Sequence, residues 1–207
     1  MGIMMIPRFL RRPPVTLFII KANIIVFVLW IFLGQRFMYD NFLVSWTGVL
    51  EGRYWTLLTS VFSHNLLFHI FLNMYAFFGF GTVLENEIGS LRFLRFYLSA
   101  GIIASIAHSL VSAYLMGQPD LPALGASGAV SGTILLFSLL NPKEKILLLG
   151  IIPLPVLFAA LVFVGLDIWG LISQTQGGDL PIGHGAHLGG ALYGLVYYFI
   201  LRMRGET

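Results

Sequence analysis

The sequence contains no cysteine, which excludes disulfide bonds, a thiol nucleophile and cysteine-ligated metal sites. Charged residues are also scarce, since they make up only 10% of the 207 residues, whereas hydrophobic residues make up 57%. The mean hydropathy is +0.87. Soluble domains carry far more charge than this, so the composition indicates a protein that lies within a lipid bilayer.

The small excess of positive charge, +3 in total, does not indicate a nucleic-acid partner. Binding to nucleic acid would require Lys and Arg to cluster on one soluble face, and they do not. The basic N-terminal segment leads into an apolar run that is longer than that of a signal peptide and lacks a small-residue cleavage pattern. We therefore expect this run to remain in the protein as its first membrane span.

Six stretches of the chain are candidate membrane spans, since a helix needs about 20 mostly apolar residues to cross a bilayer core of about 30 Å. We predict an all-α membrane protein, a six-transmembrane-helix bundle that forms a single polytopic domain over residues 1–207. The predicted spans are roughly 14–34, 66–84, 93–116, 125–140, 146–172 and 184–201. Pro153 and Pro155 are expected to bend the fifth span.

Basic residues lie beside span ends that share one side of the membrane: Arg8, Arg11, Arg12, Lys21, Arg92, Arg95, Lys143, Lys145, Arg202 and Arg204. Two connections on the opposite side, 117–124 and 173–183, contain no Lys or Arg. Because cytoplasmic loops retain basic residues, we predict a multi-pass protein of the cell inner membrane with both termini in the cytoplasm.

The first outer connection, residues 35–65, is long and rich in aromatic side chains, including Trp46 and Trp55. Aromatic residues among polar ones are typical of segments at the level of the lipid headgroups. The first outer loop is therefore predicted to be partly embedded in the membrane. An ordinary exposed loop is the alternative.

Several polar side chains are predicted at similar depth in the outer half of the membrane. His69 and Asn73 are four residues apart in the second span and therefore share one helical face. Ser127 lies at the start of the fourth span, and His184 and His187 lie in the first turns of the sixth. Polar groups are costly in a bilayer, so those that face the interior of a bundle are candidate functional residues.

The fourth span is short, because a helix over residues 127–140 is about 21 Å long and the bilayer core is about 30 Å thick. The helix should begin below the membrane surface, and the non-helical segment before it should dip inward. Such backbone is tolerated only where protein or water satisfies its polar groups. This arrangement predicts a water-accessible cavity that contains Ser127.

The fourth and sixth spans carry small residues four positions apart: Gly128 with Gly132, and Gly190 with Gly194. Such faces let helix backbones approach closely, although many membrane helices use them only for packing. A close approach of these two helices would bring Ser127 and His187 within hydrogen-bonding distance.

These motifs resemble those of the rhomboid intramembrane serine proteases. The corresponding residues are Gly125-Ala-Ser-Gly128 for GxSG, Ala186-His187 with Gly190 and Gly194 for AHxxGxxxG, and His64, His69 and Asn73 for HxxxxHxxxN. The resemblance runs from about Glu51 to the C-terminus and is to the minimal six-transmembrane bacterial or archaeal type. In one departure, the Trp-Arg pair common in relatives appears here as Trp55-Thr56.

The resemblance implies a rhomboid-like bundle and an intramembrane serine endopeptidase that cuts membrane-protein substrates in or near their transmembrane helices. Ser127 would be the nucleophile and His187 its base in a Ser-His dyad. His69, Asn73 and the backbone amide of Ser127 would stabilise the oxyanion. The partners would be transmembrane substrates and the lipid bilayer, with no cofactor, no metal and no nucleic acid.

Other polar residues are interpreted as supporting groups. A third, orienting carboxylate stays open as an alternative, but Asp167 and Asp179 are interpreted as ordinary interfacial residues. His184 is interpreted as lining of the cavity rather than as the base. His64 is expected to anchor a loop. A zinc site is disfavoured because the sequence has no HExxH motif and no carboxylate suitably spaced from its histidines.

Two other functions remain as alternatives. A catalytically silent rhomboid-like protein would bind membrane clients without cutting them, but Ser127 and His187 are both present. A six-span transporter would need a polar pathway across the membrane, whereas the polar residues here lie only in the predicted outer half.

Overall fold

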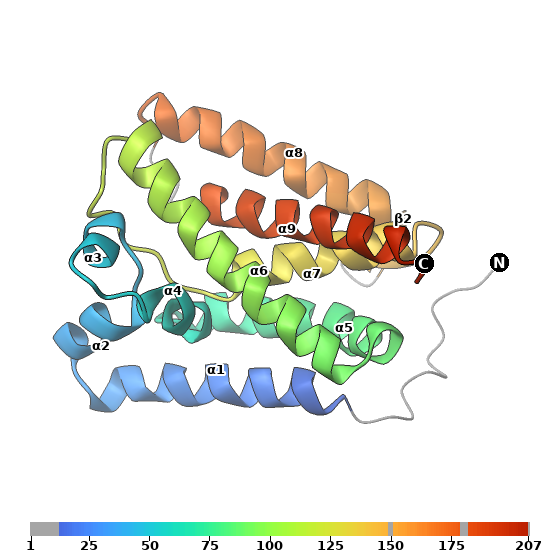
Figure 1. Ribbon diagram of the computed structural model, residues 1–207, viewed down its shortest axis with the longest axis horizontal. Helices are drawn as coiled ribbons and strands as arrows, with labels where there is room; N and C mark the ends of the chain where they lie inside the picture. Colours follow the sequence, from blue (N-terminus) through green and yellow to red (C-terminus); the bar gives the residue numbers. More distant parts are fainter. Residues whose placement is uncertain (1–12, 149–150, 179–181, 207) are drawn as a thin grey trace.

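Long helices form the body of the protein (Figure 1). The computed structural model describes residues 13–148, 151–178 and 182–206. The helices of the body are α1 (Pro14–Phe32), α5 (Leu67–Ile88), α6 (Ser90–Leu110), α7 (Ser127–Leu140), α8 (Val156–Thr175) and α9 (His184–Met203). α6 continues into a π-helical turn, η3 (Val111–Leu115). The prediction of an all-α bundle is confirmed apart from one short β-hairpin.

Four of the described helices are long and apolar enough to cross a membrane, namely α1, α5, α6 together with η3, and α8. α7 is shorter, with 14 residues, as expected for the fourth span. α9 has 20 residues but carries several polar side chains along its length. The assignment of α7 and α9 as membrane spans stays a prediction.

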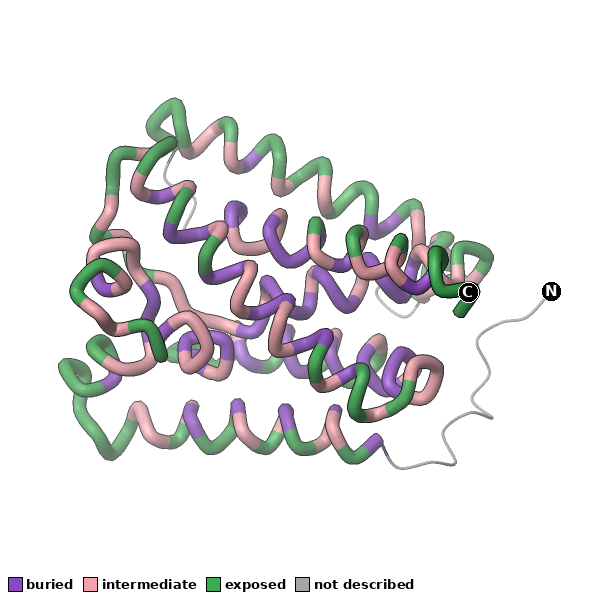
Figure 2. The backbone as a smooth tube through the Cα atoms, in the orientation of Figure 1, coloured by how far each residue is buried: buried purple, intermediate pink, exposed green. Residues whose placement is uncertain are grey.

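α7 lies at the centre of the bundle and packs against α5, α6, α8 and α9, most extensively against α9. α1 and α8 lie on opposite outer sides (Figure 1). Figure 2 shows that buried residues gather along the inner helices, whereas α1 and α8 present exposed residues outward. These exposed residues include Phe18, Phe32, Phe163 and Trp169. Large apolar side chains on the outer surface fit contact with lipid.

The start of α1 is held by a buried carboxylate from another helix. Glu85 of α5 accepts hydrogen bonds from the backbone N–H groups of Val15 at 3.0 Å and Thr16 at 2.8 Å, and from the Thr16 hydroxyl at 2.8 Å. The Ser90 hydroxyl donates to the same carboxylate at 2.6 Å. N–H groups in the first turn of a helix lack intrahelical acceptors, and the helix dipole favours negative charge there. Glu85 therefore fixes α1 to the turn between α5 and α6.

Glu85→Ala is expected to lower the free energy of unfolding by on the order of 3 kcal/mol, because it leaves buried donors without an acceptor. Unfolding of the purified protein by denaturant in detergent measures this loss. Glu51→Ala is the matched control, since Glu51 is exposed and pairs with Arg53 at the surface. Exposed ion pairs contribute at most about 1 kcal/mol. Equal losses in the two variants would contradict the anchoring of α1 by Glu85.

A short antiparallel hairpin replaces the first part of the predicted fifth span, because β1 (Lys145–Leu148) pairs with β2 (Ile152–Pro155). α8 begins directly after β2. The predicted start of the span at residue 146 is therefore wrong, and so is the predicted bend. A proline lacks an N–H group and favours an extended conformation in the preceding residue. Pro153 and Pro155 consequently lie before the helix instead of bending it.

The corresponding helix ends lie within about four residues of the other predicted span ends. The largest difference is at the end of α5, which was predicted at residue 84 and lies at Ile88. Gly89 ends this helix, because its φ of 85° is a conformation that glycine adopts readily. Loss of apolar character is therefore a poor guide to where this helix stops.

The first outer connection is folded into short helices. These are α2 (Gln35–Phe42), α3 (Trp46–Leu50), α4 (Thr56–Thr59) and the 3₁₀ turn η2 (Ser60–Phe62). Arg53 joins them through ion pairs with Asp40 at 3.3 Å and Glu51 at 2.8 Å. Val44 pairs with Ala123 in an isolated bridge, which attaches this region to the segment before α7. The depth of this connection in the membrane stays a prediction.

The start of α1, the turn between α5 and α6, the β-hairpin and the end of α9 lie at one end of the bundle, and α2 to α4 lie at the other (Figure 1). The first end carries most of the described basic residues that flank the spans: Arg92, Arg95, Lys143, Lys145, Arg202 and Arg204. Arg8, Arg11 and Arg12 lie outside the described residues. Arg36 and Arg53 lie at the other end, where each is close to Asp40. Outside this first connection, the predicted separation of ends that carry Lys and Arg from ends that lack them is present.

Candidate active site

Glycines on α7 and α9 bring the two backbones into contact. A Cβ atom added at Gly132 would lie 2.6 Å from the carbonyl oxygen of Gly190, and one added at Gly194 would lie 2.5 Å from the carbonyl oxygen of Gly132. Cβ atoms essentially never approach other atoms so closely, so a larger residue would push the helices apart. The close approach predicted from the two small-residue patterns is confirmed.

Ser127 and His187 meet where these two helices begin. Ser127 is the first residue of α7, and His187 lies in the first turn of α9. Nε2 of His187 lies 2.9 Å from Oγ of Ser127, which is a hydrogen-bonding distance. The N–H groups of the first turn of α7 point out of the helix, and the helix dipole favours negative charge there. A hydroxyl, an imidazole and a helix N-terminus suited to an anion therefore lie together.

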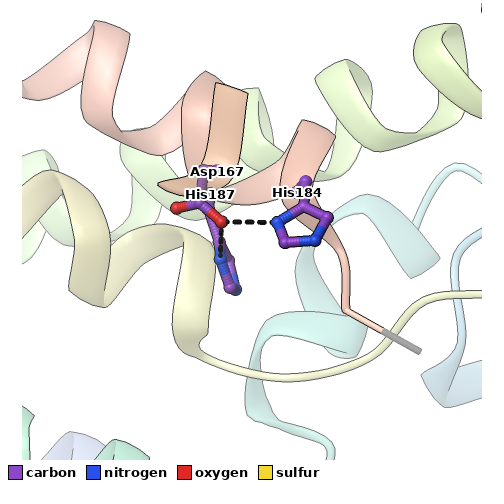
Figure 3. Close-up of side chains that lie close together, drawn as sticks. All are labelled: Asp167, His184 and His187. Atoms are coloured by element: carbon purple, nitrogen blue, oxygen red, sulfur yellow. Dashed lines mark hydrogen bonds and ion pairs between the residues drawn. The ribbon is translucent and has the colours of Figure 1, made fainter. Parts of the chain in front are cut away.

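A carboxylate from α8 extends this chain of hydrogen bonds (Figure 3). Oδ1 of Asp167 lies 2.9 Å from Nδ1 of His187 and 2.7 Å from Nδ1 of His184. The side chain of Asp167 is only 13% exposed. The interpretation of Asp167 as an ordinary interfacial residue is therefore wrong. His184, interpreted as lining of the cavity rather than as the base, bonds to this carboxylate. Asp179 lies outside the described residues.

The bonds to Asp167 determine which ring nitrogen of His187 carries a proton. An ionised carboxylate only accepts hydrogen bonds, so Nδ1 of each histidine must donate. The neutral ring of His187 then has its lone pair on Nε2, the atom that faces the Ser127 hydroxyl. Nε2 therefore accepts a hydrogen bond from that hydroxyl, which is the orientation that a general base requires.

His64 and His69 support the segment that enters α7. Nε2 of His64 accepts a hydrogen bond from the Ala126 N–H at 3.3 Å. Burial, with a smaller contribution from the neighbouring His69, lowers the pKa of His64 to about 3, so the ring is neutral and can accept this bond. The ring of His69 lies against Gly125, where an added Cβ would be 2.8 Å from Cε1 of His69. The prediction that His64 anchors a loop is confirmed, and His69 lies close to the start of α7.

Asn73 is engaged within its own helix. Its Nδ2 donates to the carbonyl oxygen of His69 at 2.9 Å, and the residue is 7% exposed. This bond uses one of the two amide hydrogens. The predicted contacts of His69 and Asn73 with an oxyanion stay predictions.

Asp167, His184 and His187 also offer ligand atoms that lie within 4.8 Å of one another. The expectation that no suitably spaced carboxylate accompanies the histidines is therefore wrong in space, because the carboxylate comes from a different helix. Both Nδ1 atoms already donate to Asp167. A metal ion would have to replace these protons. The arrangement is accounted for by hydrogen bonding among the three side chains.

Curated proteins with related names are similar to this chain, and three of them illustrate the likeness. It is 34% identical over 200 residues to RHOMBOID-like protein 12, mitochondrial, of Arabidopsis thaliana, an alignment that covers 91% of this chain and 58% of that protein. It is 35% identical over 185 residues to Presenilin-associated rhomboid-like protein, mitochondrial, of Homo sapiens, with 86% and 46% covered. It is 33% identical over 165 residues to Rhomboid-like protein 16, chloroplastic, of Arabidopsis thaliana, with 72% and 51% covered. The chain thus spans about half the length of the curated relatives it matches.

These relatives overturn the predicted location. Their names assign them to mitochondria or chloroplasts rather than to a cell membrane. The prediction of a cell inner membrane with both termini in the cytoplasm is therefore wrong. The distribution of Lys and Arg indicates which span ends share a side of the membrane, but it does not say which membrane the protein occupies.

A family model matches the same part of the chain that carries the motifs. The model of the Rhomboid domain matches residues 51–204. This region includes α7 and α9 with their contacting glycines, and the loop that His64 anchors. On the strength of this match and of its relatives, the chain belongs to the rhomboid family.

Proposed function

We propose that this chain is an intramembrane serine endopeptidase in which Ser127 is the nucleophile and His187 is the general base. The observation that carries the proposal is the distance of 2.9 Å between Nε2 of His187 and Oγ of Ser127. The bond from Nδ1 of His187 to Asp167 adds support, because it leaves the Nε2 lone pair directed at the hydroxyl.

Acylation begins when Oγ of Ser127 bonds to the carbonyl carbon of the scissile peptide and Nε2 of His187 takes the hydroxyl proton. The positive charge that forms on the ring of His187 is stabilised by Asp167. The ring then gives its proton to the leaving amine nitrogen as the C–N bond breaks. Water repeats the sequence on the acyl-enzyme, which releases the acid and restores the hydroxyl.

The oxyanion of the tetrahedral intermediate needs donors that are already in place, each of which contributes about 3 to 4 kcal/mol by deletion. The backbone N–H of Ser127 fits this role because it belongs to the N-terminal turn of α7. His69 is the second donor in this proposal, and its contact with Gly125 supports the assignment. Asn73, one turn further along α5, is the third.

The proposed substrates are membrane proteins cut in or near their transmembrane helices. The exposed apolar faces of the outer helices support this, because they fit a protein whose partners also lie in the bilayer. A helix hides its peptide bonds in internal hydrogen bonds, so the cleaved segment must first unwind. Glycine, proline and other weak helix formers near the cleavage site favour unwinding.

A labelling experiment tests this function on the purified chain in detergent and in liposomes. We expect a fluorophosphonate probe to modify Ser127, with the modified peptide identified by mass spectrometry, and a model transmembrane substrate to be cleaved. Prior modification should abolish cleavage. A chain that neither reacts with the probe nor cleaves any tested substrate would instead favour a silent rhomboid-like protein that binds membrane clients.

A further inference from the structure

His184 is buried at the start of α9 and does not contact the nucleophile. The residue is 5% exposed, and its Nδ1 donates to Oδ1 of Asp167 at 2.7 Å. The same oxygen accepts the bond from Nδ1 of His187 at 2.9 Å. Two imidazoles one helical turn apart on α9 therefore share one carboxylate oxygen of α8, as Figure 3 shows.

One hydrogen bond would leave the Asp167 carboxylate poorly fixed, because the terminal torsion of aspartate is broad and roughly two-fold. A second donor that approaches the same oxygen restricts rotation of the carboxylate plane. We infer that His184 is a positioning residue, which holds Asp167 in the orientation that keeps the lone pair of His187 on Nε2. This inference rests on the proposed protease function.

The backbone of α8 is shaped to admit the ring of His184. Gly170 is buried three residues after Asp167, and a Cβ atom added there would collide with the ring, at 2.7 Å from its Cδ2 atom. Few other residues of α8 are buried: Val156, Ala159 and Ala160 lie near its start. Gly170 and Asp167 thus both contact the start of α9 from the C-terminal half of α8.

The decisive test replaces His184 in two ways. Nδ2 of asparagine can occupy the position of Nδ1 and donate the same bond, whereas leucine fills similar volume and donates nothing. We expect His184→Leu to lower kcat by about 10-fold to 100-fold with little change in KM, the scale that a misplaced catalytic group produces. His184→Asn should stay within about 3-fold of the wild type. A role in apolar packing would give the opposite order, with leucine tolerated and asparagine harmful.

A second pair of variants tests the same contact from α8. Gly170→Ala should reduce kcat as His184→Leu does, because the added methyl group displaces the ring of His184. Gly165→Ala on the same helix is the control, since nothing lies within 4 Å of a Cβ atom added there. In the His184→Asn background, where no ring is present, Gly170→Ala should lose most of its effect.

The results for the wild type and for the variants distinguish the positioning role of His184 from the protease function on which it rests. A wild-type chain that does not cleave the model substrate counts against the protease. A wild-type chain that cleaves, with His184→Leu and Gly170→Ala both at wild-type kcat, overturns the positioning role of His184 alone. Melting temperatures of all variants, compared with that of Gly165→Ala, show whether a loss of kcat reflects unfolding.

Discussion

His187→Ala is expected to reduce kcat for cleavage of a transmembrane substrate by at least about 10³-fold, and Ser127→Ala by a similar factor. The two losses should be similar because the residues act as a unit, joined by the 2.9 Å bond between Oγ and Nε2. For the same reason the double variant should be little worse than either single one. Cleavage assays in liposomes at saturating substrate measure all three.

His108→Ala is a suitable control for a lost imidazole, because Nε2 of His108 bonds to the carbonyl oxygen of Leu121 rather than to Ser127. Any effect of this variant should appear in folding yield, with kcat per folded molecule close to that of the wild type. Turnover that survives both Ser127→Ala and His187→Ala would show that another site or a contaminant performs the reaction.

Asp167→Asn is expected to lower kcat by between about 10² and 10⁴ fold, since the corresponding change in a Ser-His-Asp triad lowers kcat by about 10⁴ fold. The amide of asparagine can present its NH₂ group to the histidines. Nδ1 of His187 would then act as acceptor, which places the ring proton on Nε2 and removes the lone pair from the Ser127 hydroxyl. KM should change little, because Asp167 is held within the protein by both histidines.

Asp120→Asn provides the comparison, because Asp120 is an exposed carboxylate in the segment before α7. Both variants lose one negative charge, so a general electrostatic effect would lower both rates. A kcat for Asp167→Asn within about 3-fold of that for Asp120→Asn would show that the carboxylate does not direct the proton of His187.

Elements whose signal is local were predictable from the sequence. Most helix ends, the short α7 and the contact between α7 and α9 follow from runs of apolar residues and from glycines four apart, which are features of one segment at a time; the start of α8 and the end of α5 do not. The proximity of Ser127 and His187 follows from that helix contact together with the resemblance to a known family.

Asp167 was missed because its partners are on another helix. Nothing in the sequence around Asp167 indicates which face of α8 meets α9, since an apolar outer helix has no strong amphipathic pattern to orient it. Gly170 is the residue that could have revealed the contact. Gly170 lies three residues after Asp167 and therefore on the same face of α8. A glycine on that face indicates that a neighbouring element approaches the helix closely there.

The β-hairpin was missed for a different reason. Residues 146–155 are as apolar as a membrane span, so hydropathy alone extends the fifth span through them. α8 does not extend back through Pro153 and Pro155, because these residues have no N–H group and cannot donate the hydrogen bonds of a helix interior. The positions of prolines should therefore take precedence over hydropathy in placing the start of a span.

Main-chain atoms make the contact between α7 and α9, and such a contact responds differently from side-chain packing when the thickness of the bilayer fluctuates. Side-chain packing yields when a bilayer thins or thickens, because rotamers change at small cost. At these glycines the carbonyl oxygen of the facing helix lies where a side chain would begin, so there is no rotamer to adjust, and we expect the two helices to shift as one rigid pair. We therefore expect the outer helices to absorb elastic deformation by the surrounding lipid, while Oγ of Ser127 and Nε2 of His187 keep their distance of 2.9 Å.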